Sequence, residues 1–173
     1  MQAAKDSFYM ALRARLAALN PARTVVIDGV TVPGILVREN METRFTEAQA
    51  GVFYLDFGDV LIAESSRPML GMDCNIWYAS EGTTGGTGVD RGRMLAEMDD
   101  ELMRICTPPH VAMLDYSKSP AADWGAGIFW TMPELGKAPG AAAIAQRQWS
   151  ASESRAGRYA QMRIYFFLPE AEA

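Results

Sequence analysis

Two stretches of the sequence repeat apolar residues at the three- and four-residue spacing of an amphipathic helix. Residues 4–20 contain no proline or glycine and stop before Pro21, and residues 91–106 stop before Pro108-Pro109. The sequence therefore predicts two helices, with Asp6 or Ser7 capping the first and Asp90 capping the second. The predicted apolar stripes are Phe8, Leu12, Leu16 and Leu19 in the first helix, and Leu95, Met98, Leu102 and Ile105 in the second.

Two other stretches alternate with the period of two that is typical of a strand with two different faces. In residues 72–78, one face carries Met72, Cys74, Ile76 and Tyr78, and the other carries Asp73, Asn75 and Trp77. Residues 158–168 alternate over the greatest length, so we expect this strand to be long and central. Residues 24–27 and 30–32 flank Asp28-Gly29, the dipeptide best suited to a type I′ hairpin turn.

The remaining apolar runs are short and indicate further strands. We predict them at residues 35–37, 52–57, 60–63, 111–116 and 127–131, with a turn at Gly58-Asp59 between the second and third. Residues 38–51 and 132–154 are insertion-like and indicate loops or arms. Together these elements predict one α+β domain over residues 1–173, with a mixed or mainly antiparallel β-sheet flanked by two amphipathic helices.

The composition and charge of the chain exclude some classes of binding partner. The chain has 173 residues, 49% of them hydrophobic, and a formal net charge of −5. That charge argues against a basic surface that grips nucleic-acid phosphates. Charge within the first six residues, and the lack of about 18 consecutive apolar residues, predict neither an export signal nor a membrane span.

The acidity is concentrated in one part of the chain. Residues 51–106 carry ten acidic and four basic side chains, whereas the flanking segments are nearly neutral. On the second helix, consecutive acids point around the axis instead of converging on one cation. We therefore predict a solvated acidic surface made by Glu97, Asp99, Asp100 and Glu101.

No catalytic, metal or cofactor motif stands out. Cys74 and Cys106 belong to no cluster with metal-ligand spacing, and the chain has a single histidine, His110, without a nucleophile motif. Residues 82–88 form a glycine-rich loop before the second helix, a frame that can hold phosphate. The loop lacks both the GxGxxG spacing and a terminal Lys-Ser or Lys-Thr. A flexible connection is therefore the preferred interpretation, and a phosphate cradle is the alternative.

Aromatic residues supply the candidate contacts with partners. Trp77, Trp149, Tyr165 and Phe167 are candidate interface residues, with core packing as the alternative role.

The order of elements carries a resemblance to a known family. The chain begins with a helix, which is followed by a β-rich stretch with an Asp-Gly turn, an alternating strand and one more helix. A strand pair then closes the order with the sequence RYAQMRIYFFL of residues 158–168. This order is similar to that of tail-terminator or tail-completion proteins of long-tailed bacteriophages and prophages. The opening phrase KDSFYMAL also resembles prophage-type proteins of similar size.

The resemblance implies a structural virion protein without enzymatic activity or cofactor. Such subunits form a ring, usually a homohexamer, that caps the tail tube, stops its polymerisation and provides the head–tail joining surface. The implied partners are the subunit itself, the tail tube protein and the head-completion or connector protein, while DNA passes through without specific binding. The implied location is the virion tail, assembled in the host bacterial cytoplasm. The alternatives are another tail or connector adaptor, and a small cytoplasmic ligand-binding domain or enzyme that uses residues 82–88.

Overall fold

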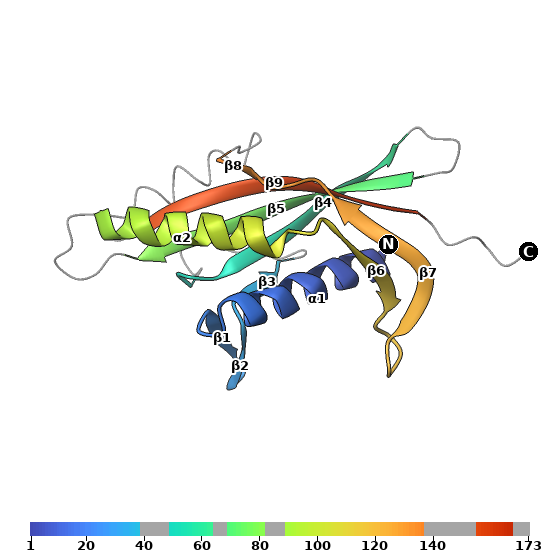
Figure 1. The fold of residues 1–173 in the computed structure, drawn as a ribbon, viewed down its shortest axis with the longest axis horizontal. Coiled ribbons are helices and arrows are strands. Elements are labelled where there is room, and N and C mark those ends of the chain that lie inside the picture. The colour runs from blue at the N-terminus through green and yellow to red at the C-terminus, as the bar shows by residue number, and fades with distance from the viewer. Residues whose placement is uncertain (39–48, 64–68, 82–88, 137–154, 168–173) are drawn as a thin grey trace, which may run out of the picture.

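The computed structural model describes residues 1–38, 49–63, 69–81, 89–136 and 155–167. These residues form two helices, a seven-stranded mixed sheet and a separate two-stranded hairpin, which confirms the predicted α+β class (Figure 1). The elements are α1 (Gln2–Leu19), β1 (Thr24–Ile27), β2 (Val30–Pro33), β3 (Ile35–Val37), β4 (Phe53–Ala63), β5 (Met69–Glu81), α2 (Val89–Ile105), β6 (His110–Asp115), β7 (Ala122–Trp130), β8 (Glu134–Leu135) and β9 (Arg155–Phe167).

The large sheet has the strand order β3-β4-β5-β9-β7-β6, and β8 pairs with β9 beside this path. Among the described strands of this sheet, β3 and β4 run parallel and every other pair is antiparallel. The strand β9 pairs with β5 along its whole length, while β7 and β8 share its other edge. The predicted central position of this strand is therefore confirmed.

The sheet curls around α1. This helix contacts the strands at both ends of the sheet, β3 and β6, which a flat sheet of this width would not allow (Figure 1). The ring of Phe8 meets Trp130 of β7 edge-on at 5.1 Å between centroids and Phe57 of β4 at 6.4 Å. One helix therefore fills the concave side of the sheet.

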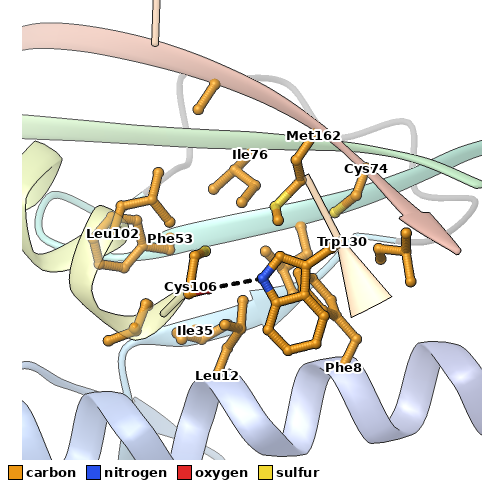
Figure 2. Close-up of a cluster of buried hydrophobic side chains, with 14 of the residues drawn as sticks. Phe8, Leu12, Ile35, Phe53, Cys74, Ile76, Leu102, Cys106, Trp130 and Met162 are labelled. Atoms are coloured by element: carbon orange, nitrogen blue, oxygen red, sulfur yellow. Dashed lines mark hydrogen bonds between the residues drawn. The ribbon is translucent and has the colours of Figure 1, made fainter. Parts of the chain in front are cut away.

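The main core is formed by the predicted helix stripes and one face of the long strands. Figure 2 shows Phe8 and Leu12 of α1 pointing toward Ile76 and Met162 on the sheet. The indole Nε1 of Trp130 donates a hydrogen bond of 2.9 Å to the backbone oxygen of Cys106 inside this core. The predicted alternation is confirmed: Met72, Cys74, Ile76 and Tyr78 are all fully buried there.

Arg15 joins α1 to α2 and to β6. Its guanidinium donates hydrogen bonds to the backbone oxygens of Ile105 at 2.9 Å, Pro108 at 2.8 Å and His110 at 3.2 Å. It also lies over the Trp130 ring, 5.3 Å from the centroid. Partial burial lowers the pKa of Arg15 from its usual value, and the cation remains suited to the carbonyls that end α2. One side chain thus fixes the relative positions of three elements.

The predicted cap of α1 is wrong. The helix begins at Gln2 with Met1 at the N-cap position and no side-chain cap, so Asp6 and Ser7 lie inside it. Ser7 instead faces the outer edge of β6, where the backbone N–H of Leu114 donates to its hydroxyl at 2.8 Å. The hydroxyl occupies a position on a sheet edge that another strand would otherwise fill.

Two further predictions need correction. Gly58-Asp59 is not a turn between two strands, because β4 runs without a break from Phe53 to Ala63. A register shift against β5 between Phe57 and Val60 accommodates these residues as a bulge, which local sequence does not distinguish from a turn. Asp90 lies in the first turn of α2, which begins at Val89, and is not the residue before it.

The predicted hairpin is confirmed. Its register pairs Thr24 with Pro33 and Ile27 with Val30. Asp28 and Gly29 both have positive φ, 49° and 80°, as a type I′ turn requires.

We predict that Arg15→Lys destabilises the fold by roughly 1.5–3 kcal/mol, because a lysine ammonium cannot reproduce the planar fork that reaches three carbonyls. Arg13→Lys is the matched control on the same helix, since Arg13 lies over the Tyr9 ring at 5.2 Å and an ammonium keeps that contact. Urea unfolding of both variants measures the difference. Equal midpoints for the two variants would contradict the joining role of Arg15.

Candidate functional site

Trp77 is a core residue of the hairpin attachment and does not form a surface. It is 4% exposed and lies on the face of β5 opposite the main core. Its ring contacts Tyr159 at 4.5 Å, and the Tyr159 hydroxyl donates to Asn75 Oδ1. The candidate interface role of Trp77 is therefore replaced by a structural one. This second cluster consists of Val25, Val52, Tyr54, Trp77, Ala79 and Tyr159, so it attaches β1 to the outer face of the sheet.

An aromatic and aliphatic surface lies on the outer face at the other end of the sheet. The strand register brings together Leu61 of β4, Tyr165 of β9 and Phe129 of β7, which we call the outer patch. Phe129 and Tyr165 stack at 5.3 Å with planes 20° apart. Leu61 is 52% exposed and Phe129 39% exposed. The outer patch therefore presents apolar surface that the described residues do not cover.

Gly71 shapes this patch. It sits between Leu61 and Tyr165 in the register, and a Cβ atom at this position would lie 3.3 Å from the Tyr165 ring. Because glycine has no side chain, the Tyr165 ring lies against the strand and the surface stays flat. Of the two other candidate interface residues, Phe167 is half-buried and pairs with Met69, two residues after Tyr165 on β9. Trp149 lies outside the described residues.

A second exposed apolar surface is the end of the β1–β2 hairpin. Val26, Ile27 and Val30, which we call the hairpin tip, are 58%, 39% and 62% exposed. Figure 1 shows this hairpin at the lower left beside α1, away from the upper right, where β4 finishes and β5 begins. This surface was not among the candidate interfaces predicted from the sequence. The available signal was that Val25, Val26 and Ile27 of β1 are apolar without alternation, which is typical of a strand covered on both faces.

The predicted acidic surface is partly engaged in internal contacts. Asp99 accepts a hydrogen bond from the buried Tyr78 hydroxyl and pairs with Arg158 at 3.2 Å. Burial, together with the Asp99 carboxylate, raises the pKa of Tyr78, so this hydroxyl stays a donor. These contacts fix α2 against β5 and β9.

Glu101 is engaged in the same way on the other side of α2. It forms an ion pair with Arg23, which follows α1, and accepts a hydrogen bond of 2.6 Å from Asn20 Nδ2. Both partners of the ion pair are largely buried. Of the predicted acidic residues, Glu97 and Asp100 are exposed, and they lie beside Arg104 in a shallow hollow of about 310 Å³.

Part of the excess of acidic residues in 51–106 is therefore used for ion pairs within the fold. Three of its carboxylates, Asp73, Asp99 and Glu101, pair with arginines from outside that segment. Asp73, for example, accepts a hydrogen bond of 2.6 Å from Arg163 Nε on β9. A fourth, Asp56, is half-buried, and this burial raises its pKa while Arg38 opposes the shift.

The described residues contain no group of acidic, histidine or cysteine side chains arranged to hold a metal ion. Cys74 and Cys106 are both buried. The glycine-rich loop of residues 82–88, on which the alternative ligand-binding function depends, lies outside the described residues.

Comparisons with protein-family models and with curated proteins find no match to this chain. Neither of the two described helices combines the length and hydropathy that crossing a membrane requires.

We predict that Glu101→Gln destabilises the fold by roughly 1–3 kcal/mol, because it leaves the largely buried Arg23 guanidinium without its counter-ion. Glu97→Gln, one turn earlier and exposed, is expected to stay within about 0.5 kcal/mol of the parent. Thermal unfolding of the two variants tests this contrast. If Glu101→Gln matched Glu97→Gln, the Arg23–Glu101 pair would have no structural role.

We also predict that neither thiol of the native chain reacts with iodoacetamide at pH 8. Burial raises the pKa of Cys106 to about 12 and raises that of Cys74 as well, so both remain protonated and inaccessible. Denaturant should expose two reactive thiols per chain. Mass spectrometry of the alkylated protein measures this, and rapid labelling without denaturant would contradict the packing.

Proposed function

We propose that this chain is a structural subunit of a bacteriophage or prophage tail, the tail terminator or completion ring. In this role, copies of the chain form a ring, a hexamer in the family it resembles, that caps the tail tube and stops its polymerisation. Its partners are the tail tube protein on one side and the head-completion or connector protein on the other. Its place is the virion tail, after assembly in the host bacterial cytoplasm.

One observation carries this proposal: the described residues present two different exposed apolar surfaces, the hairpin tip on β1 and β2 and the outer patch on β4, β7 and β9. A closed ring of more than two copies uses head-to-tail contacts, in which one surface of each subunit meets a different surface of its neighbour. A twofold dimer would need only one self-complementary patch. The hairpin tip and the outer patch supply the two surfaces that the ring requires.

The charges support passage of DNA without specific binding. The exposed acids Glu97 and Asp100 lie on α2, and the net charge of the chain is negative. Arg93 and Arg104 are also exposed on α2, so the support comes from the net negative charge of the chain, which disfavours tight binding of phosphates.

The proposal predicts that the purified chain forms particles of several subunits, up to six times the 19.0 kDa subunit mass, at micromolar to millimolar concentration. Val30→Lys should shift these particles to monomer, because a charge enters an apolar contact. Ala18→Lys, at an exposed position on α1, is the control and should leave the particles intact. Static light scattering measures the mass.

A different outcome would favour the alternative. If the chain stays monomeric, also when mixed with tail tubes, and if nucleotide or inorganic phosphate raises its melting temperature, a ligand-binding domain replaces the ring. A parent chain that is monomeric alone and assembles on tail tubes would keep the ring proposal, because some rings form only on their partner.

A further inference from the structure

We propose that the β1–β2 hairpin is an arm that opens independently of the rest of the fold, and that the ion pair between Arg23 and Glu101 is the latch that keeps it closed. The arm consists of residues 24–33. Opening means that the arm leaves the outer face of the sheet while both helices and the large sheet stay folded. This inference concerns the single chain and does not depend on the proposed ring.

The arm has few attachments to the rest of the chain. Among the described strands, β1 and β2 pair only with each other and form a sheet separate from the seven-stranded one. Figure 1 shows the hairpin standing apart from the large sheet, beside the end of α1. Val25 is buried and Val32 is half-buried beside it, whereas most other positions of the arm are exposed. A segment with few buried apolar contacts opens at a lower free energy than the core does.

Arg23 provides the latch at the base of the arm, because it immediately precedes β1. Its Nε donates a hydrogen bond to Glu101 Oε2 on α2, and its Nη2 donates to Oε1 at 3.1 Å. Both side chains are largely buried, at 14% and 13% exposure. A two-bonded pair of this kind fixes distance and orientation together. It therefore holds the arm to α2, a helix whose apolar stripe belongs to the main core.

Two glycines make room for this arginine. A Cβ atom on Gly34 would lie 3.3 Å from Arg23 Cγ, and a Cβ atom on Gly51 would lie 3.2 Å from Arg23 Nη1. The backbone oxygen of Gly51 also accepts a hydrogen bond from Nη1 at 3.3 Å. The arginine is thus enclosed at the base of the arm, where a cation without its counter-ion is strongly destabilising.

Opening of the arm has a measurable consequence at Val25. This side chain is 3% exposed and packs in the second cluster with Tyr54, Trp77 and Tyr159, so release brings it into water. An isolated two-stranded hairpin is at best marginally stable in water, so the released arm also loses its own strand pairing. A thiol at position 25 is therefore accessible in the open arm and protected in the closed one.

Labelling of Val25→Cys with iodoacetamide, in the full folded chain, tests the opening. Cys74 and Cys106 are buried in the main core and report opening of the whole fold in the same sample. Mass spectrometry of the separate peptides gives one rate for each thiol. We expect the thiol at position 25 to react while Cys74 and Cys106 stay protected, because the main core remains closed.

A second substitution in the Val25→Cys chain identifies the latch. Glu101→Gln should raise the labelling rate at position 25 by about fivefold to a hundredfold, because the ion pair exists only in the closed arm. Glu97→Gln, exposed and one turn earlier on α2, is the matched control and should leave this rate unchanged. Ile164→Val weakens the main core but should also leave it unchanged, because Ile164 stays packed when the arm opens.

Two results would overturn the proposal. If the thiol at position 25 reacts no faster than Cys74 in every variant, the arm opens only with the whole fold. If Glu101→Gln leaves the rate at position 25 unchanged, the ion pair is not the latch. Hydrogen exchange of the parent chain checks the opening without an added cysteine: the amides of residues 24–33 should exchange before those of β5 and β9, and equal protection would contradict an independent arm. None of these outcomes alters the light-scattering test of the ring.

Discussion

Phe8 of α1 packs edge-on against Trp130 at one side of the sheet and against Phe57 at the other, and the fold depends on this bridge. Because β7 shares only three register pairs with β9, the β6–β7 part of the sheet is weakly joined through backbone hydrogen bonds alone. The α1 helix provides the missing connection through its apolar stripe, through Ser7 on the edge of β6 and through Arg15 on the carbonyls of Ile105, Pro108 and His110. The position of the helix thus determines the curvature of the sheet.

The elements with a strong period could be predicted from the sequence, and the contacts between distant elements could not. The stripe from Phe8 to Leu16 and the alternation from Met72 to Tyr78 repeat over enough residues to define a face. Arg15 lies off the stripe, and only the fold shows that the end of α2 comes within its reach. The β4 bulge was read as a turn because glycine followed by aspartate is typical of both.

The same limit applies to the candidate surfaces. The acidic residues of α2 form one run in the sequence, yet the fold gives Asp99 and Glu101 buried or half-buried partners from other segments. Trp77 shares its face with polar residues, which indicated exposure, but the hairpin and Val52 cover it. Tyr165 was identified as a candidate by its aromatic character, whereas the patch around it depends on the register that places Gly71 and Phe129 beside it. Register is a property of paired strands, and no single strand encodes it.

Because side chains alternate along the strands, the residues that stabilise the fold and the residues that are available for association lie on opposite faces of the sheet at the end that carries the outer patch. Along β9, Ile164 and Phe166 are buried against the helices, whereas Tyr165 between them points to the outer face. On β4, Val60 packs against the core and Leu61 does not. Because one face stabilises the subunit and the outer face is exposed at the end that carries Leu61 and Phe129, residues of the outer patch can change without opening the core. A subunit that must fold first and then bind its neighbours needs such a division. Here it follows from the period of two in the sequence, with the glycine at position 71 keeping the outer face flat.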